Sequence, residues 1–294
     1  MSVIFKTATD FRRSLEARLK TISEKTNEDL QRLRRRVAFD RFLARIFMQE
    51  KSDFFLKGGY SMELRISQAR ATKDIDLTYL RRVKNSEELL IELIFQDLQE
   101  IARIDLQDHF VFRIEKSQFD LKNVPYGGAR FPIVSLIDGR LFVRFQLDVG
   151  ADAVVDEVDE VKGNDWLNFC GVSAPQISMI SVTQQFAEKL HAYTLPRDGR
   201  FNSRVKDLID LILLLKMKKK HDLQKFYLAL KKVFKVRGTH TLPDKLLFPP
   251  EEWQLIFSAM AKECSLSKNM RQSFLEIDKF YRKIINIAEN NLEI

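Results

Sequence analysis

Two stretches of sequence decide the fold: residues 58–65 read GGYSMELR, and residues 70–77 read RATKDIDL. A short apolar run, FFLK at residues 54–57, precedes the first stretch and is typical of a strand. The paired glycines Gly58 and Gly59 then predict a tight turn that opens a helix. In the second stretch polar and apolar residues alternate, as they do in a strand with one buried face. The sequence therefore predicts a strand, a glycine turn, a helix and a second strand.

Carboxylates gather on the predicted strands. Asp74 and Asp76 lie two residues apart, so their side chains leave the same face of a sheet. Carboxylates so close repel each other, and that cost is tolerable where a hard divalent cation lies between them. A third carboxylate, Asp148, lies near the end of FQLDVG at residues 145–150, in a strand that is otherwise apolar enough to be central. Three acids on neighbouring strands suit two-metal phosphoryl chemistry, although an Asp-x-Asp on a surface strand can also simply be solvated.

The glycine turn offers a phosphate site beside these acids. Backbone N–H groups at Gly58 and Gly59, where a helix opens, can cradle phosphate oxygens. Ser61 is placed to add a hydroxyl. The turn and the acids together favour a triphosphate substrate held by metal ions.

A second charged set lies in the later part of the chain. Lys189 belongs to a helical pattern over residues 183–195, and Lys206, Asp207 and Asp210 share an arc at the start of a helix over 203–217. That helix continues into a Leu-rich run, so its charges must face a cleft or pair together. One interpretation is a structural ion pair between Lys206 and Asp210. We favour a role for Lys189 at the phosphates, with Asp207 and Asp210 positioning it or the nucleotide.

The remaining patterns indicate an α+β protein. A helical lead-in over residues 1–50 precedes the glycine turn. Strand patterns follow at residues 111–117, 129–136 and 141–149, and Asp138-Gly139 predicts a hairpin turn between the last two. After Gly150 the patterns are helical, apart from a short strand near residues 177–180. We predict a mixed sheet with flanking helices in an N-terminal lobe, residues 1–165, then a mainly helical C-terminal lobe, residues 166–294, with the active site in the cleft between them.

Composition excludes several classes of protein. The chain has 294 residues, 45% of them apolar and 31% charged, which is typical of a globular protein with one large or two smaller domains. Its two cysteines cannot build a disulfide framework or a four-cysteine zinc site. No apolar run approaches the length of a membrane span, and the N-terminus lacks the apolar stretch of a signal peptide. We expect a cytoplasmic protein with no membrane partner.

The positive charge is concentrated in one segment. The net charge is +8, and residues 216–245 contain ten Lys and Arg against two acids, which equals the whole excess. Within this segment a helical pattern over residues 222–236 turns four lysines outward: Lys225, Lys231, Lys232 and Lys235. A solvated amphipathic helix is the simpler interpretation. The other is a surface that binds nucleic acid, with a marked dependence on salt.

Four motifs in a fixed order, GGYSMELR…RATKDIDL, FQLDVG, FAEKLHA and RVKDLIDL, resemble those of the AbiEii/MenT family of nucleotidyltransferase-like toxins from bacterial toxin–antitoxin and abortive-infection systems. The resemblance implies a nucleotidyltransferase-type sheet and a Mg²⁺-dependent reaction, with Mn²⁺ as a substitute. It assigns phosphate binding to Gly58, Gly59 and Ser61, and metal binding to Asp74, Asp76 and Asp148. It assigns catalysis to Lys189 and Asp207, nucleotide contacts to Lys206 and Asp210, and regulatory phosphorylation to Thr72. Apart from the resemblance, Arg65 and Arg70 are candidates for further phosphate ligands.

The implied reaction moves a nucleoside monophosphate from an NTP to RNA. The acceptor would be the 3′ end of a tRNA, which would block translation, and the lysine-rich helix would receive the RNA. A cognate antitoxin is the expected protein partner. Two alternatives stay open on the same residues. The enzyme could modify a protein, as a nucleotidyltransferase or a kinase, or the chain could be a non-catalytic module that binds NTP and RNA.

Overall fold

The computed structural model describes residues 5–48, 51–81, 86–117, 119–120, 127–196, 204–217 and 221–290. The chain forms two compact units whose segments interleave in the sequence. The first unit comprises Met1–Leu64, Ala71–Asp152 and Glu160–Met179, and the second comprises Arg65–Arg70, Ala153–Asp159 and Ile180–Ile294. The sequence predicts one boundary at residue 165. In the structure, two short segments that precede this position, one of six and one of seven residues, belong to the second unit.

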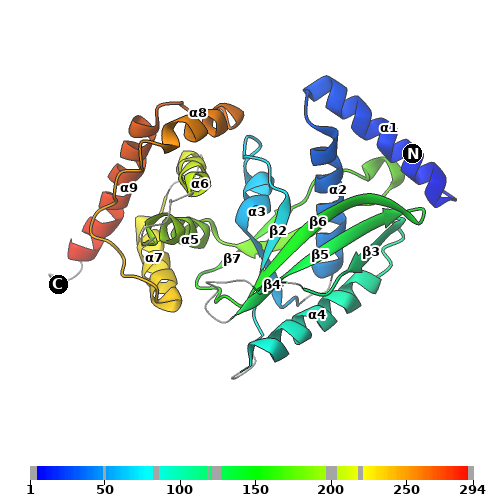
Figure 1. Ribbon diagram of the computed structural model, residues 1–294, viewed down its shortest axis with the longest axis horizontal. Coiled ribbons are helices and arrows are strands. Elements are labelled where there is room, and N and C mark those ends of the chain that lie inside the picture. The colour runs from blue at the N-terminus through cyan, green and yellow to red at the C-terminus, as the bar shows by residue number, and fades with distance from the viewer. Residues whose placement is uncertain are drawn as a thin grey trace. The chain divides into compact units, whose positions relative to one another are not determined.

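A mixed sheet is the centre of the first unit (Figure 1). Its strands follow the order β3-β5-β6-β2-β1-β8-β7, with β4 beside β5. Strand β2 is parallel to β6 and antiparallel to β1, and β1 is parallel to β8. The bounds are β1 Phe54–Lys57, β2 Asp74–Tyr79, β3 Phe110–Ile114, β4 Phe119–Asp120, β5 Gly128–Ile137, β6 Arg140–Gly150, β7 Val158–Lys162 and β8 Gln176–Ile180.

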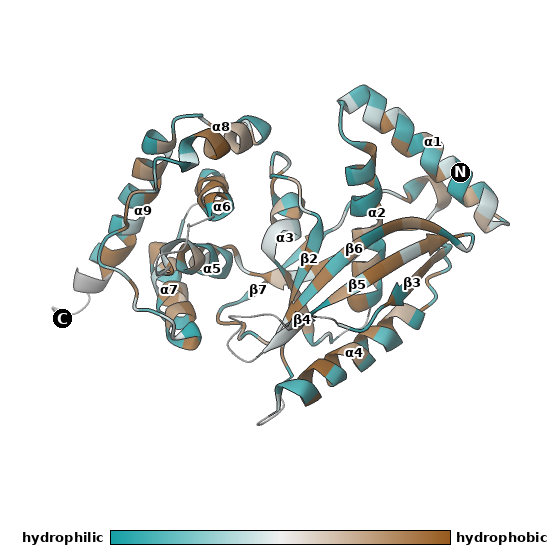
Figure 2. Cartoon of the chain, in the orientation of Figure 1, coloured by the Kyte–Doolittle hydropathy of each residue, from teal (hydrophilic) through white to brown (hydrophobic). Residues whose placement is uncertain are grey.

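Helices of the first unit pack against one face of this sheet, and charged side chains lie on the other. The helices are α1 (Ala8–Thr26), α2 (Leu30–Ile46), α3 (Gly58–Arg65), α4 (Glu87–Arg103) and the 3₁₀ turn η1 (Asn168–Cys170). From α2, Phe39 packs edge-on against Phe145, and from α4, Phe95 stacks on Phe131. Figure 2 shows apolar residues along β5 and β6, the strands that carry these rings. Because strand side chains alternate, the residues between the buried ones point to the opposite face.

The second unit is built mainly from helices: α5 (Val182–Thr194), α6 (Val205–Lys216), α7 (Leu223–Arg237), α8 (Trp253–Glu263) and α9 (Met270–Asn290). In its core Phe186, Phe226 and Phe280 pack edge-to-face against one another, and Leu208, Ile209 and Leu211 of α6 are fully buried. The caps of two helices are visible in the sequence, since Ser181 and Asp222 accept hydrogen bonds from the first turns of α5 and α7. Within the described ranges, none of the helices combines the length and the apolar character that a bilayer-spanning segment requires.

The strand and helix predictions are largely confirmed, with one error after Gly150. Asp138 and Gly139, both with positive φ, form the predicted hairpin turn between β5 and β6. Strand β7 was not predicted. Its sequence, VDEVK, lies at the edge of the sheet and has no buried residue, so it lacks the apolar alternation on which strand prediction depends. Charges on an edge strand also oppose pairing with another sheet, which explains their presence there.

Candidate active site

Four charged residues of the first unit occupy one register position across four adjacent strands. Lys57 on β1 pairs with Asp76 on β2, Asp76 with Asp148 on β6, and Asp148 with Arg130 on β5. Residues that pair directly across strands point to the same face, and Asp74 joins that face from two residues before Asp76. We call these five residues the carboxylate row. The sheet thus brings the three predicted carboxylates together on the face opposite to α2 and α4.

Arg130 is a member that sequence reasoning missed. Its guanidinium donates two parallel hydrogen bonds to Asp148, each of 2.6 Å. The bond to Asp148, helped by the negative charges of Asp148, Asp74 and Asp76, raises the pKa of Arg130 above its ordinary value despite partial burial. The pairing of Arg130 with Asp148 depends on a register shift between β5 and β6. Leu136 pairs with Leu141 but Ser135 pairs with Val143, and this shift of one residue brings Arg130 opposite Asp148.

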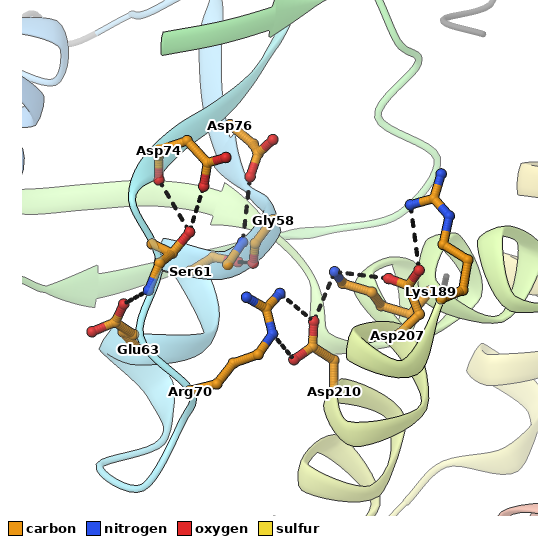
Figure 3. Close-up of polar contacts among 12 residues, drawn as sticks. Gly58, Ser61, Glu63, Arg70, Asp74, Asp76, Lys189, Asp207 and Asp210 are labelled. Carbon is orange, nitrogen blue, oxygen red and sulfur yellow. Dashed lines mark hydrogen bonds and ion pairs between the residues drawn. The ribbon is translucent and has the colours of Figure 1, made fainter. Parts of the chain in front are cut away.

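Asp76 and Asp74 are held by neutral donors at the glycine turn (Figure 3). The backbone N–H of Gly59 donates to Asp76 over 3.4 Å, and the Thr72 hydroxyl donates to Asp74 over 2.5 Å. Gly58 has φ +70°, and a Cβ there would lie 1.9 Å from an oxygen of Asp76. Glycine is therefore required at this position both for the backbone and for the close carboxylate.

The other residues of the glycine turn are buried. The Ser61 hydroxyl donates to the Gly58 carbonyl over 2.9 Å, so it closes the first turn of α3, and its contact with a phosphate stays a prediction. Thr72 is also buried, and its backbone N–H donates to Glu63 over 2.6 Å. Glu63 in turn pairs with Arg32 of α2 over 3.0 Å. Glu63 was not singled out from the sequence, because its partner is the backbone of a segment nine residues away.

The carboxylates suit a divalent cation that prefers oxygen ligands. Among the described residues, no group of three or more His, Cys, Asp or Glu side chains is arranged to hold a metal ion. Arg130 engages both oxygens of Asp148. The other two carboxylates of this face are Asp74 and Asp76. Two carboxylates completed by substrate phosphates are a usual environment for Mg²⁺. The residues therefore fit such an ion together with a bound triphosphate.

A second charged cluster lies in the second unit. Lys189 of α5 forms ion pairs with Asp210 over 2.8 Å and with Asp207 over 3.2 Å, both from α6 (Figure 3). The guanidinium of Arg70 donates two hydrogen bonds to the carboxylate of Asp210, of 3.0 and 2.9 Å. Arg204 lies 3.4 Å from the other oxygen of Asp207. We call these five residues the Lys189 cluster. As expected for charges on a buried helix, they pair together.

Burial and ion pairing oppose each other in this cluster. Burial alone would lower the pKa of Lys189, but Asp210 and Asp207 raise it above its ordinary value, so the ammonium keeps its proton. Burial alone would likewise raise the pKa of Asp210, and Lys189 and Arg70 instead lower it. Lys206 is exposed on α6, whereas Asp210 is fully buried against Arg70 and Lys189. The charge that holds Asp210 thus comes from α5 and from the 65–70 segment.

Arg65 is engaged within the second unit. Its guanidinium donates to the Ile180 carbonyl over 2.6 Å and to Asp159 over 2.7 Å, and a further bond reaches Gln185. Burial lowers the pKa of Arg65, although Asp159 counteracts this. The predicted contact with a nucleotide stays a prediction, and the observed contacts connect the end of α3 to the start of α5.

Helix α7 presents the predicted lysines to solvent. Lys225, Lys231, Lys232 and Lys235 are all exposed, while Phe226, Leu230 and Val233 of the same helix are buried. Lys225 lies 2.9 Å from Glu157, and Lys232 donates to the Val155 carbonyl over 3.2 Å. The segment 153–159 thus contacts part of this lysine face.

Comparison with known proteins gives a family match over most of the chain. A family model described as "Nucleotidyl transferase AbiEii toxin, Type IV TA system" matches residues 41–278. Among solved structures, MenT4, a nucleotidyltransferase toxin from Mycobacterium tuberculosis H37Rv, is 13% identical, with 92% of this chain and 97% of that chain covered and a TM-score of 0.54. JHP933 from Helicobacter pylori is also 13% identical, with 88% and 95% covered and a TM-score of 0.47. A search of the curated proteins finds no match. At this identity, the likeness to MenT4 shows a shared fold.

Proposed function

The chain belongs to the AbiEii family of nucleotidyltransferase toxins from type IV toxin–antitoxin systems, and from this premise we propose that it transfers a nucleoside monophosphate from an NTP to the 3′ end of a tRNA. The transfer would release pyrophosphate and block translation. One observation carries the proposal, namely that Asp74, Asp76 and Asp148 share one face of two adjacent strands beside a glycine turn.

Metal and phosphate binding are assigned to the first unit. Asp74 and Asp76, with Asp148, would hold Mg²⁺ or Mn²⁺, and such ions neutralise a triphosphate and orient the attacking oxygen. The N–H groups of Gly58 and Gly59 would bind phosphate oxygens, because N–H groups at the start of a helix attract anions. This assignment is supported by the glycine-specific backbone at Gly58 and by its contact with Asp76.

Proton transfer and charge neutralisation are assigned to three further residues. Asp148 would accept the proton of the attacking hydroxyl, as a carboxylate within reach of it can do. Lys189 would offset the negative charge that develops on the triphosphate. Asp207 and Asp210 would orient Lys189, and the two short ion pairs that they form with it support this task. Arg65, Ser61 and Lys206 are proposed as further nucleotide ligands.

The RNA acceptor is assigned to the exposed lysines of α7. Replacing Lys231, Lys232 and Lys235 with Glu removes three exposed positive charges and adds three negative ones, so tRNA affinity at low salt should fall at least tenfold or so. NTP affinity should stay unchanged, because α7 carries none of the proposed nucleotide ligands. Filter binding with labelled tRNA measures the first quantity and calorimetry with an NTP the second. Undiminished tRNA affinity at low salt would remove this role from α7.

We propose a cognate antitoxin as the partner and the cytoplasm as the compartment, since tRNA and NTPs are found there. Thr72 is proposed as a site of regulatory phosphorylation. A phosphate adds nearly two negative charges, and on Thr72 it would stand against Asp74, which the Thr72 hydroxyl already contacts. Phosphorylation would therefore oppose binding of the triphosphate.

A labelling experiment separates this proposal from its alternatives. The protein is incubated with total tRNA, a protein extract and NTPs labelled at the α or the γ phosphate. Transfer of α label to tRNA is the expected result. Transfer of α label to protein would indicate a protein-directed nucleotidyltransferase, and γ label on protein would indicate a kinase. Binding of NTP and Mg²⁺ with no transfer to any acceptor would indicate a binding module and would contradict the proposal.

A further inference from the structure

Arg130 stands out because it occupies the third carboxylate of the proposed metal site. Its guanidinium binds both oxygens of Asp148 at 2.6 Å in a fork-to-fork geometry. The pair lies on the face of the sheet opposite to α2 and α4, where the Arg130 side chain is 42% exposed and that of Asp148 is 13% exposed. Arg130 is therefore a cation in direct contact with one of the carboxylates that would hold the metal.

The position of Arg130 depends on a specific irregularity of the sheet. The hairpin turn at residues 138–139 pairs Ile137 with Arg140, and continuing that register without change would place Arg130 opposite Leu147. Leu147 points to the buried face. The bulge between Ser135 and Leu136 shifts the register by one residue, so Arg130 reaches the charged face instead. A bulge that redirects one side chain toward a site is a recurrent functional device.

The positive charge of Arg130 reduces repulsion between the carboxylates of the row. The row contains three carboxylates, and repulsion between Asp76 and Asp148, which face each other across adjacent strands, is reduced by a cation at the Asp148 end. A divalent ion would provide the same compensation. The guanidinium already occupies one lone pair on each oxygen of Asp148, and its positive charge repels a second cation, so Arg130 and a divalent ion compete for Asp148.

We propose that Arg130 is a built-in counterion that competes with the divalent cation for Asp148, so that metal entry displaces its guanidinium. This inference rests on the proposed function, because it takes the metal site at Asp74, Asp76 and Asp148 as given. Arg130 thereby lowers the affinity for the metal alone and keeps the carboxylates in place when no metal is bound. Since 42% of the Arg130 side chain already faces solvent, it can move away without opening the core.

The test measures binding of Mn²⁺ alone, with no nucleotide, by the electron paramagnetic resonance signal of the free ion. Removing the Arg130 guanidinium from Asp148 should make the free energy of Mn²⁺ binding more favourable by on the order of 1 kcal/mol. This corresponds to an affinity roughly fivefold to tenfold higher. Arg130→Gln should therefore bind Mn²⁺ about tenfold more tightly than the natural protein. Arg130→Lys, which keeps a charge but loses the fork, should lie between the two.

The matched control is Arg144→Gln. Arg144 is exposed on β6, on the same face as Asp148 and four residues before it, so this variant loses the same charge about 13 Å away along the strand. Its Mn²⁺ affinity should stay within about twofold of the natural value. Equal or weaker Mn²⁺ binding by Arg130→Gln, or equal tightening by both variants, would overturn the inference.

Asp76→Asn separates failure of this inference from failure of the proposed function. If the natural protein binds Mn²⁺ and Asp76→Asn does not, the metal site stands, and an unchanged affinity in Arg130→Gln refutes only the role of Arg130. If Asp76→Asn binds Mn²⁺ as well as the natural protein, or neither the natural protein nor Arg130→Gln binds it, the metal site itself fails and the inference fails with it. Urea denaturation of each variant confirms that the compared proteins are folded.

Discussion

The carboxylate row and the Lys189 cluster are both built from five charged residues, but their charges are balanced in opposite ways. The row has three carboxylates and two cations, and the ammonium of Lys57 is also paired with Asp152. The cluster has two carboxylates and three cations. The side chain of Asp148 in the row is 13% exposed, whereas those of Asp210 and Asp207 in the cluster are 0% and 6% exposed. The first region is left negative and the second positive.

This difference teaches which charges the fold itself requires. Buried charges need partners, because taking an unpaired ion out of water costs several kcal/mol, and the cluster provides a partner for each. Nothing in the folding of a sheet requires three acids on one face, and their repulsion opposes it. An unbalanced row is useful when a metal and a triphosphate bind there. We therefore expect loss of a buried cluster carboxylate to lower stability as well as the proposed activity of Lys189, and loss of a row carboxylate to lower mainly activity.

The largest expected contrast comes from the same substitution in the two regions. Asp210→Asn leaves Arg70 and Lys189 buried beside a neutral amide, so the free energy of unfolding should fall by about 3 kcal/mol. Asp76→Asn reduces repulsion in the row and should change stability by less than about 1 kcal/mol. Urea denaturation measures both. A loss of several kcal/mol in Asp76→Asn would mean that the row is a structural device after all.

A second contrast concerns the glycine turn. Gly58 and Gly139 both have positive φ, but a Cβ at Gly139 meets nothing within 4 Å, whereas one at Gly58 meets Asp76. Gly139→Ala should cost about 1 kcal/mol, the usual penalty for the left-handed backbone. Gly58→Ala should cost roughly 1 to 2 kcal/mol more, because the carboxylate must also move, and it should reduce transfer activity. Denaturation midpoints and the transfer assay check both effects, and equal costs for the two variants would contradict the close contact.

The smallest effect is expected at Thr72, which holds Asp74 with a neutral donor. Thr72→Val removes the hydroxyl and keeps the shape, so stability should fall by about 1 kcal/mol. Thr72→Ser keeps the donor and should recover most of that loss. Thermal denaturation of the two variants measures the difference. A loss as large as that of Asp210→Asn would erase the distinction between the two regions.

Most of the fold could be predicted from the sequence because the signals were local. The alternation in DIDLTY and the Asp-Gly hairpin each depend on neighbouring residues, and the structure has both of them. Strand β7 could not be found this way, since an exposed edge strand has no apolar side to mark it. The interleaving of the two units also escapes local patterns, because it depends on which distant segments pack together.

Part of the candidate site could also be predicted from local sequence signals. The carboxylates, the glycines and Lys189 lie in short motifs. Arg130 was missed because a bulge decides its register, and the role of Arg70 beside Asp210 joins residues 140 positions apart. The helical spacing of Lys206 and Asp210 suggested a pair, but Lys189, from another helix, lies 2.8 Å from Asp210. The sequence identifies which residues carry charge, and local spacing predicts which of them are neighbours on one helix. Tertiary packing decides which of them meet across different elements.

We propose that the carboxylate row is the reaction centre of a nucleotidyltransferase that acts on tRNA. The most direct measurement is the rate at which α label from an NTP enters the 3′ end of tRNA, for the natural protein, for Asp76→Asn and for Glu88→Gln, which removes an exposed acid of the same unit. We predict that Asp76→Asn lowers the rate by about a thousandfold or more and that Glu88→Gln leaves it unchanged. A folded Asp76→Asn protein that labels tRNA at the natural rate would contradict the account.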